Sequence, residues 1–569
     1  MSHHHTLTEL RHSAAHLLAH AILELYPKTI LTIGPATAEG FFYDILPLES
    51  LRIDDLPLIH QKMQELVSRN LAITHEQISK TEARKLFAHN QFKLELINDI
   101  DGETVGLSRQ GDFIDLCKGG HVSRTGLLKY TLLTGISGAY WRADKNNQAL
   151  QRISGTAFFS PQELDDWVHQ REEAAKYDHR KLGKQMDLFS FHQEGVGFPF
   201  FHPKGKTVIN RMIDFLRKEQ TAHGYQEIST PICLNKELWE RSGHYEFYKD
   251  NMYFCSIDET EYAIKPMNCP GAFLLYNERP HSYRQLPLRL AEFGLVHRHE
   301  LSGVLHGLMR ARSFTIDDAH IICTIDQVEQ EIITTITLLQ RVLKAYGFES
   351  IKIGLSTKPE NAMGSDEIWH KAESALKNAL NSCTVPFVIQ EGEGAFYGPK
   401  IEFKILDSLK REWQCGTIQV DFFMPTNFDL TYVSSEGTKE RPVIIHRAIY
   451  GSLERFFAIL LEHYKGRLPF WLAPVQITVL TITEAQQPYA QTIYQSLQQN
   501  GIRAIIDHGS DPISGKIKNA QLEQIPLMVI AGKKEAEKGT VTIRYADGSQ
   551  KADISLSELI ALVSGMNSV

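Results

Sequence analysis

Apolar residues recur at helical spacing in three segments of the first third of the chain. Segment 10–25, LRHSAAHLLAHAILEL, and segment 54–70 place apolar side chains three or four residues apart, which predicts amphipathic helices. Segment 162–180, QELDDWVHQREEAAKYDHR, also has helical character but carries polar residues on most of its faces. A helix of that kind suits a connection between domains, and we expect a linker there.

The pattern changes near residue 187 and again after Pro474. Between these points, short β-rich runs broken by glycine and proline alternate with helices and long runs typical of antiparallel strands. After Pro474 the chain alternates between predicted helices and predicted strands, the strands covering 475–482, 502–508, 526–532 and 541–546. These last residues, about 95 of them, predict a compact α/β unit.

Length and composition are those of a multidomain globular protein. The 569 residues correspond to about three or four domains. The chain is 43% hydrophobic and 22% charged, and no run of about 20 apolar residues predicts a membrane span. No signal-peptide core precedes the first helix, and the seven cysteines are scattered without a CxxC pair, so we expect a cytoplasmic protein without a disulfide framework. The net charge of −8 does not exclude a nucleic-acid partner.

The most informative stretch is HRHELSGVLHGLMRARSFTIDDAHIIC, residues 297–323. It predicts the end of a strand (291–300), a glycine-containing loop and a second strand (310–323), which would bring Arg298, Glu300 and Phe314 together. Arginine matches phosphate oxygens, a phenylalanine face stacks a base, and glutamate accepts from an exocyclic amine. Together these describe an ATP site. The alternative is a β-hairpin that carries surface charges.

A second arginine lies in the segment GSLERFFAILLEH, 451–463, which predicts an amphipathic helix. Arg455 lies one turn into this helix and could neutralise distal phosphates of the same nucleotide. Arginines on helices are usually solvated, so this observation has weight only beside the stretch at 297–323.

Three separated segments each contain a potential metal ligand. Cys269 lies in KPMNCPG, His320 ends FTIDDAH, and His446 lies in VIIHRAIYG. One cysteine and two histidines would make a three-ligand zinc site with an open fourth position. Taken alone, each of these residues more often has a structural role; ligation is favoured because each lies at the end of a strand-like run beside the nucleotide motifs.

The N-terminal region holds a second set of such residues. His12 and His16 are four apart on one face of a predicted helix, and DLCKGGH supplies Asp115, Cys117 and His121. These residues could bind zinc or could position water for hydrolysis. The remaining alternative is a helix with core histidines.

The motifs resemble those of the class II aminoacyl-tRNA synthetases. Arg298-x-Glu300 with Arg310 and Phe314 is similar to motif 2, GSLER to motif 3, and GYQEISTPICL around Pro231 to motif 1, which builds the dimer interface. The segments KPMNCPG, FTIDDAH, IIHRAIYG, GEGAFYGPKIEF (392–403) and QCGTIQVDF (414–422) resemble the threonyl-tRNA synthetases in particular. The resemblance covers essentially the whole chain.

The resemblance implies a fold and a domain order. It implies an α+β multidomain protein with an N-terminal α+β editing domain, a class II antiparallel-sheet catalytic domain and a C-terminal α/β anticodon-binding domain. The expected bounds are 1–161 for editing, 162–180 for the linker helix, 181–470 for catalysis and 471–569 for anticodon binding. The chain starts at the editing region, so the resemblance is to a bacterial form without the small N-terminal ubiquitin-like domain.

The resemblance also implies an activity: threonine is activated with ATP and transferred to the 3′ end of tRNA(Thr), by a cytoplasmic homodimer. Arg298, Arg455 and Gln414 would be catalytic, and ATP, with its Mg²⁺, would be bound by Arg298, Glu300, Arg310, Phe314 and Arg455. Threonine would be bound by Asp318, Tyr397 and Gln419 and by one zinc ion per subunit on Cys269, His320 and His446. His244 would lie near the tRNA 3′ end. The editing residues would be His12, His16, Lys93, Asp115, Cys117 and His121, which would hydrolyse seryl-tRNA(Thr) without a metal.

The expected chemistry is self-consistent. A metal that needs both an amine and a hydroxyl rejects valine, because a site built for a hydroxyl discriminates by about 10⁴ or more. Serine has both groups and differs by one methyl, a difference of roughly 1–3 kcal/mol. Such a pocket therefore requires a separate editing site.

Three positions depart from the usual family pattern: Ile316 stands where glutamine is usual, Ala272 where histidine is usual, and Tyr245 where tryptophan is usual. The rival hypotheses are a prolyl or seryl enzyme of the same subclass, a synthetase-like RNA binder, and a factor that only edits. The zinc triad and Asp318 argue against the first. Intact Arg298, Glu300, Arg455 and zinc ligands argue against the second, and the full-length catalytic domain argues against the third.

Overall fold

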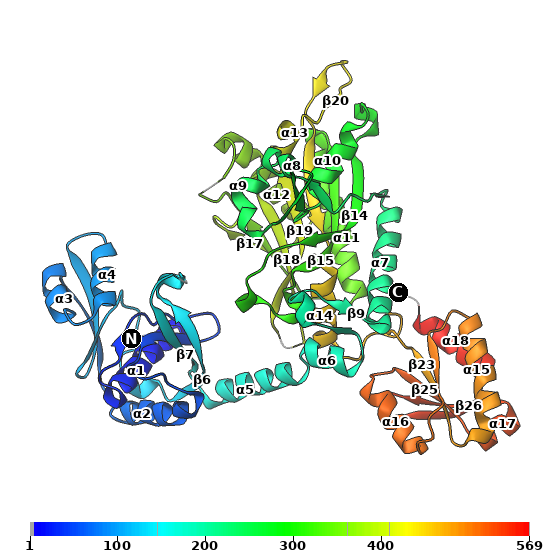
Figure 1. Ribbon diagram of the computed structural model, residues 1–569, viewed down its shortest axis with the longest axis horizontal. Coiled ribbons are helices and arrows are strands. Elements are labelled where there is room, and N and C mark those ends of the chain that lie inside the picture. The colour runs from blue at the N-terminus through cyan, green and yellow to red at the C-terminus, as the bar shows by residue number, and fades with distance from the viewer. Residues whose placement is uncertain (1–4, 145, 361, 409, 568–569) are drawn as a thin grey trace. The chain divides into compact units, whose positions relative to one another are not determined.

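The computed structural model describes residues 5–144, 146–360, 362–408 and 410–567 (Figure 1). The chain divides into two compact units, one up to residue 172 and the other from residue 173 onward. In the described part of the chain, none of the helices combines the length and the apolar character needed to cross a bilayer.

The first unit contains two antiparallel sheets, β1-β2-β7-β6 and β3-β4-β5. Its strands are β1 Ile30–Leu31, β2 Phe41–Leu46, β3 Ile73–Ser79, β4 Thr104–Gln110, β5 Phe113–Leu116, β6 Tyr130–Tyr140 and β7 Ala149–Phe158, and its helices are α1 Leu7–Leu25, α2 Leu56–Ser68, α3 Lys80–Leu86 and α4 Gln91–Asp99.

Helix α1 shows why the N-terminal segment folds as it does. Thr6 and Glu9 form a reciprocal capping box that satisfies the first free N–H groups. Most of the helix from Leu10 to Ile22 is buried, and it packs against α2, β2 and β7. The pattern at 10–25 and 54–70 therefore predicted both helices of this core correctly.

The predicted linker helix is two helices. α5 Pro161–Lys176 has no buried residue among those described, which agrees with its polar pattern. It ends before Tyr177, and Asp178 then caps a new helix, α6 His179–Gln185, by accepting from the N–H of Arg180. The prediction of one helix over 162–180 was wrong at this break. Asp178 lies within the polar pattern, but its side chain caps a second helix instead of continuing the first.

An eight-stranded sheet forms the centre of the second unit, in the order β10-β14-β15-β22-β19-β18-β16-β17. All neighbours are antiparallel except the pairs β10–β14 and β16–β17. These strands are β10 Gln226–Glu227, β14 Leu288–His297, β15 Ser313–Cys323, β16 Ile351–Ser356, β17 Phe387–Gln390, β18 Lys400–Leu406, β19 Glu412–Asp421 and β22 Val443–Ala448.

Smaller elements surround this sheet. The short strands are β8 Phe189–Ser190, β9 Phe200–Phe201, β11 Cys233–Asn235, β12 Tyr253–Ile257, β13 Thr260–Ile264, β20 Tyr432–Val433 and β21 Lys439–Glu440, and the helices are α7 Pro203–Ala222, α8 Lys236–Arg241, α9 His244–Tyr248, α10 Cys269–Asn277, α11 Val328–Ala345, α12 Asp366–Ser382, α13 Met424–Asn427 and α14 Leu453–His463.

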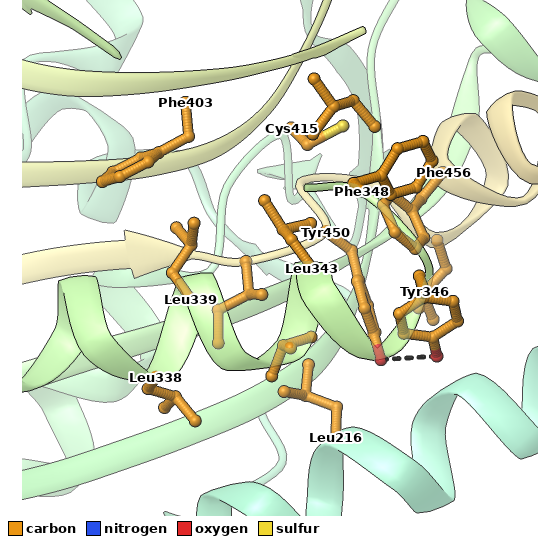
Figure 2. Packing of buried hydrophobic residues seen from close by; sticks show 14 of the residues in the cluster. Leu216, Leu338, Leu339, Leu343, Tyr346, Phe348, Phe403, Cys415, Tyr450 and Phe456 are labelled. Atoms are coloured by element: carbon orange, nitrogen blue, oxygen red, sulfur yellow. Dashed lines mark hydrogen bonds between the residues drawn. The ribbon is translucent and has the colours of Figure 1, made fainter. Parts of the chain in front are cut away.

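The main core lies between this sheet and the helices α7, α11, α12 and α14. Leu338, Leu339 and Leu343 of α11 meet buried side chains of the strands, and Figure 2 shows this packing. At one end of the cluster the hydroxyls of Tyr346 and Tyr450 hydrogen bond at 2.8 Å. Because each hydroxyl has a hydrogen-bond partner within the core, burying them does not leave an unpaired polar group.

Helix α14 begins at Leu453, two residues after Gly451, the first residue of the predicted helical segment 451–463. The side chain of Ser452 caps it by accepting from the N–H of Arg455 at 3.1 Å. Gly451 has φ +78, and a Cβ there would lie 2.8 Å from the carbonyl oxygen of Cys415. Only glycine fits that turn, and the start of α14 after it lies against β15, where Glu454 accepts from the N–H of Thr315 at 2.8 Å.

The C-terminal part is a five-stranded sheet in the order β24-β23-β25-β26-β27, parallel over its first three strands and antiparallel over the rest. The predicted α/β alternation is confirmed. Its elements are β23 Ile477–Thr481, α15 Gln487–Gln499, β24 Ala504–Asp507, α16 Ile513–Leu522, β25 Leu527–Ala531, α17 Lys533–Lys538, β26 Thr540–Tyr545, β27 Gln550–Ser555 and α18 Leu556–Met566.

Candidate functional site

Strand β15 organises the candidate site by simple alternation. Phe314, Ile316, Asp318 and His320 are two residues apart and therefore share one face of the sheet. In the sheet register His320 pairs with His446 of β22, which pairs with Gln419 of β19. One strand thus carries the predicted adenine residue near one end and the predicted metal and amino-acid residues near the other.

A cavity of about 500 Å³ lies at the Phe314 end of this face. Arg298 and Glu300 follow β14, whose last residue is His297, and Arg310 precedes β15, so all three lie on the loop side of the strand ends. The structure brings every predicted ATP residue to this one cavity, which is lined among others by Arg298, Glu300, Arg310, Phe314, Gln414 and Arg455.

The charges of this cavity are partly paired. Arg310 donates to Glu300 at 2.9 Å. Arg298 lies 5.1 Å from the Phe314 ring centroid, and Arg455 donates to the carbonyl of Met309 at 3.2 Å. Among the described residues neither Arg298 nor Arg455 has a carboxylate within ion-pair distance, and burial lowers the pKa of Arg455. Two unpaired guanidinium groups at a cavity suit an anionic ligand.

Gln414 also lines the cavity, from the start of β19. Its amide donates to Glu402 at 3.1 Å and to Thr417 at 3.3 Å. Its carbonyl oxygen faces no donor among these contacts, so the side chain can accept one more hydrogen bond.

Cys269, His320 and His446 form a buried cluster at the other end of the face. Their possible ligand atoms all lie within 4.8 Å of one another. His446 donates from Nε2 to Asp421 at 2.9 Å, and its Nδ1 has no hydrogen-bond partner among the described residues. Within the same described part of the chain, the Nε2 of His320 is also without a partner. Two buried ring nitrogens with free lone pairs, a thiol and a carboxylate behind one histidine fit a zinc ion.

The electrostatics of this cluster follow from its burial. Burial, then the neighbouring His446, holds the pKa of His320 well below its ordinary value. Burial, then Asp318 and Asp421, raises the pKa of Cys269 well above its ordinary value. His320 is therefore neutral, as a metal ligand must be, and a cation at this position would reverse the effect of burial on the thiol.

The three predicted amino-acid-binding residues surround this cluster. Asp318 accepts from Asn268 at 3.3 Å and lies 3.9 Å from the Nε2 of His320. The Tyr397 ring centroid is 5.6 Å from that of His446, and Gln419 donates to the carbonyl of Gly398 at 3.2 Å. The structure thus brings Asp318, Tyr397 and Gln419 together with Cys269, His320 and His446.

The two aspartates of FTIDDAH have opposite surroundings. Asp317 points to the other face of the sheet and accepts from the N–H groups of Ile449 at 2.7 Å and Tyr450 at 3.0 Å. Burial raises its pKa to about 7, against the neighbouring Arg447. Asp317 fixes the chain that leads from β22 to α14, and only Asp318 faces the cluster. Because neighbouring residues of a strand point to opposite faces, the sequence alone could have assigned the two aspartates to different faces of the sheet.

His244 begins α9 and is buried. Its Nδ1 hydrogen bonds to Ser242 at 2.8 Å, and its Nε2 has no partner in the part of the chain that the structure describes. Burial, then His446 and Arg298, lowers its pKa to about 4, so the ring is neutral near pH 7. Its free nitrogen can exchange a hydrogen bond with a ligand that enters.

The first unit holds the second predicted cluster. The ligand atoms of His12, His16, Cys117 and His121 also lie within 4.8 Å of one another. The Cys117 Sγ is 3.0 Å from the Nε2 of His121 and 3.6 Å from the Nε2 of His12. His12 reaches the carbonyl of Gly120 at 3.3 Å with its Nδ1, and His121 reaches Ser13 at 3.1 Å with its own.

A buried polar group stands beside these four residues. Lys93 and Asp115 form an ion pair, and the hydroxyl of Tyr43 donates to Asp115 while it accepts from Lys93 at 3.2 Å. Burial raises the pKa of Cys117 to about 11 and lowers that of His121 to about 2. Sequence reasoning missed Tyr43, because it lies in the apolar strand FFYDIL without a motif around it.

Comparisons with known proteins agree with this division. Residues 253–464 match the family described as tRNA synthetase class II core domain (G, H, P, S and T), 476–566 match the anticodon binding domain, and 105–154 match the threonyl and alanyl tRNA synthetase second additional domain. The antiparallel sheet and these matches define a class II aminoacyl-tRNA synthetase.

Relatives specify the family further. The chain is 52% identical over 537 residues to a threonine–tRNA ligase of Carboxydothermus hydrogenoformans, covering 94% of this chain and 84% of that protein. It is 50% identical over 554 residues to one of Clostridium botulinum, covering 97% and 87%. A crystal structure of the RNA binding domain of threonyl-tRNA synthetase from Cryptosporidium parvum matches with a TM-score of 0.66 and 42% identity, covering 68% of this chain and 98% of that one.

The chain belongs to the threonine–tRNA ligase family. It is an ATP-dependent aminoacyl-tRNA synthetase with a class II catalytic core, an anticodon-binding domain and an editing domain.

Proposed function

We propose that the cavity lined by Phe314 binds ATP and that each of the predicted ATP residues in its lining has a defined role. Arg298 binds the α-phosphate, Glu300 and Phe314 bind adenine, and Arg310 and Arg455 bind the outer phosphates with their Mg²⁺. Gln414 lies beside the reacting groups. The position of all six residues around one cavity supports this assignment, as do the two guanidinium groups without a carboxylate partner.

Threonine binds at the adjoining cluster in this proposal. Cys269, His320 and His446 hold one zinc ion, which supplies a Lewis acid for the amino and hydroxyl groups of threonine. Asp318 accepts from the threonine hydroxyl, and Tyr397 and Gln419 close the pocket. The observation that carries the proposal is the common face of β15, because it lines up Phe314, Asp318 and His320 along one strand.

The chain's own residues contribute mainly position and charge neutralisation. The threonine carboxylate attacks the α-phosphorus of ATP, and the bond to pyrophosphate breaks. Arg298 and Arg455 neutralise the charge that develops on the phosphate oxygens. A ribose hydroxyl of the terminal adenosine of tRNA(Thr) then attacks the threonyl carbonyl and AMP leaves. His244, neutral near pH 7, lies near that adenosine and can hydrogen bond to it.

The N-terminal cluster hydrolyses seryl-tRNA(Thr) in this proposal, and it does so without a metal. His12, His16, Cys117 and His121 position a water at the ester, and Lys93 and Asp115 fix the substrate. The short contact between Cys117 and His121 supports this, because two zinc ligands of these types would stand about 3.5 Å apart, whereas Sγ and Nε2 are 3.0 Å apart as hydrogen-bond partners.

Assembly and location belong to the same proposal. The resemblance of GYQEISTPICL to motif 1 supports a homodimer, and the absence of a disulfide framework, with seven free cysteines, supports a cytoplasmic enzyme. The four segments 1–161, 162–180, 181–470 and 471–569 would serve for editing, linkage, catalysis and anticodon recognition.

Amino-acid-dependent exchange between ATP and pyrophosphate tests the catalytic part. We expect exchange with threonine, weaker exchange with serine, none with valine, and loss of exchange when zinc is removed. The control is the same protein with zinc restored. Zinc-loaded protein that exchanges with none of the three amino acids would overturn the proposal.

A further inference from the structure

A third group of potential metal ligands lies in the second unit, outside both sites described above. It consists of Asp178 and His179 at the start of α6 and Glu462 near the end of α14. His179 is fully buried. Its Nδ1 donates to Glu462 at 2.7 Å, and its Nε2 accepts from the backbone N–H of Leu308 at 3.1 Å. Both ring nitrogens are used by the protein, so the ring has no lone pair left for a metal.

The Nε2 of His179 accepts from Leu308, a residue that lines the proposed ATP cavity. Leu308 lies in the turn Gly307–Met309, which immediately precedes Arg310, and Leu308 and Met309 both line the cavity. We call residues 307–310 the return limb of the ATP loop. The carbonyl of Met309 in this limb accepts from Arg455.

The return limb is therefore held to α14 at two points. Arg455 contacts it directly, and Glu462 contacts it through His179. These two residues are seven apart on one helix, which places them two turns from each other on the same side. Glu462 is itself held, because it also forms an ion pair with Arg411. Hydrogen bonds from His179 and the charge of Arg411 lower the pKa of Glu462 although burial opposes this.

The approach of His179 to the limb depends on a glycine. Gly307 has φ +51, and a Cβ at this position would lie 2.3 Å from the His179 Nε2. Leu308, Glu462 and His179 are all buried, so breaking the contact would leave a backbone N–H or a carboxylate without a partner away from water.

We propose that His179 is a positioning residue for ATP binding, which fixes the return limb so that Arg310 and Arg455 face the nucleotide. His179 touches no substrate and acts through Leu308 and Glu462. The inference rests on the proposed ATP site and adds a residue from a segment, 178–185, that no sequence motif connects with it.

Two substitutions of His179 with similar shapes each keep one of its two hydrogen bonds, the one with Glu462 or the one with Leu308, and remove the other. His179→Gln places an amide oxygen where Nε2 stands and keeps an acceptor for the N–H of Leu308. His179→Asn places an amide nitrogen near the Nδ1 position and keeps the donor to Glu462, but it leaves the N–H of Leu308 unpaired. We expect His179→Asn to raise the KM for ATP in pyrophosphate exchange by roughly tenfold, with the KM for threonine unchanged. His179→Gln should stay near the wild-type KM for ATP while losing comparable thermal stability.

A glycine pair in the same loop gives an independent test. Gly307→Ala should raise the KM for ATP as His179→Asn does, because its Cβ displaces the limb from His179. Gly303→Ala is the matched control, since a Cβ there would meet no atom within 4 Å among the described residues. It should leave the KM for ATP unchanged.

Either of two results would overturn the inference. One is an equal rise in the KM for ATP for His179→Asn and His179→Gln. The other is a lower melting temperature for His179→Asn with an unchanged KM for ATP, which would make the residue purely structural. A failure of the ATP site itself looks different: Arg455→Ala would then exchange as well as the wild type, whatever the His179 variants do.

Discussion

Two clusters of the chain contain nearly the same residue types and are connected differently to their surroundings. The cluster that we propose for threonine binding, the catalytic cluster, consists of Cys269, His320 and His446, and the cluster that we propose for hydrolysis, the editing cluster, consists of Cys117 and three histidines. In the catalytic cluster two ring nitrogens have no partner among the residues that the structure describes, and the Asp421 carboxylate accepts from the Nε2 of His446. In the editing cluster one ring nitrogen, the Nδ1 of His16, has no partner among the described residues, and Asp115 lies 4.0 Å from the Nε2 of the same ring. What differs there is that the thiol is hydrogen-bonded to a histidine and that the ammonium group of Lys93 lies beside the cluster in an ion pair with Asp115.

The difference teaches that ligand type alone does not decide whether a cluster binds a metal. A zinc site needs free lone pairs that point to one place, and it gains from a carboxylate behind its histidines. A site that positions water needs neutral groups already held by one another, and a nearby cation disfavours a second cation. The catalytic cluster meets the first description, and the editing cluster comes nearer to the second.

The largest expected effects come from removing one thiol from each cluster. Cys269→Ala should reduce threonine-dependent pyrophosphate exchange by about 10³, with hydrolysis of seryl-tRNA(Thr) unchanged. Cys117→Ala should slow that hydrolysis by about a hundredfold and leave exchange unchanged. Both reactions are measured on both variants, so each variant is the control for the other. If Cys117→Ala also reduced exchange, the two clusters would not be independent sites.

A smaller effect is expected from the carboxylate behind His446. Asp421→Asn keeps the size of the side chain but removes the charge that orients and strengthens the histidine. The affinity for zinc should fall by about 10- to 100-fold, measured by competition with a chelator. Ser13→Ala is the corresponding change behind His121, and it should leave the zinc content unaltered. An equal loss of zinc from both variants would contradict the assignment of the metal to one cluster.

The smallest expected effect is a pH dependence of stability in the first unit. Burial, then His12 and Lys93, holds the pKa of His16 well below its ordinary value, so the folded unit keeps this ring neutral. The unfolded chain binds a proton on it below about pH 6.5. Lowering the pH from 7 to 5 should therefore cost about 2 kcal/mol of unfolding free energy through this ring.

Hydrogen exchange of the α1 amides at both pH values measures that cost. His16→Gln should remove this part of the dependence. An unchanged pH dependence in His16→Gln would show that the pKa of His16 is the same in the folded and unfolded states, which would contradict the effect of burial.

Much of the catalytic site could be predicted from sequence because its residues lie in short contiguous motifs. Arg298, Glu300 and Phe314 fall within one stretch, and a period of two along β15 places Asp318 and His320 together. The residues that were missed are brought in by tertiary structure: Tyr43 from an apolar strand, Asp421 from the end of β19, and His179 from a helix start. Their partners are 72, 25 and 129 residues away, so no local pattern marks them.

The fold shows the same limit. The alternation after Pro474 and the helices at 10–25 and 54–70 are local signals, and the structure confirms them. The break at Tyr177–Asp178 was not predicted, because the polar pattern runs through it. Just after the end of α5, His179 makes a tertiary hydrogen bond with Glu462, and the periodicity of the sequence does not encode that contact.

The zinc content of the purified protein tests the central comparison most directly. We predict one zinc per chain in the wild type and in Cys117→Ala, and none in Cys269→Ala. Two zinc ions per chain, or one that is lost from Cys117→Ala and kept in Cys269→Ala, would contradict the account.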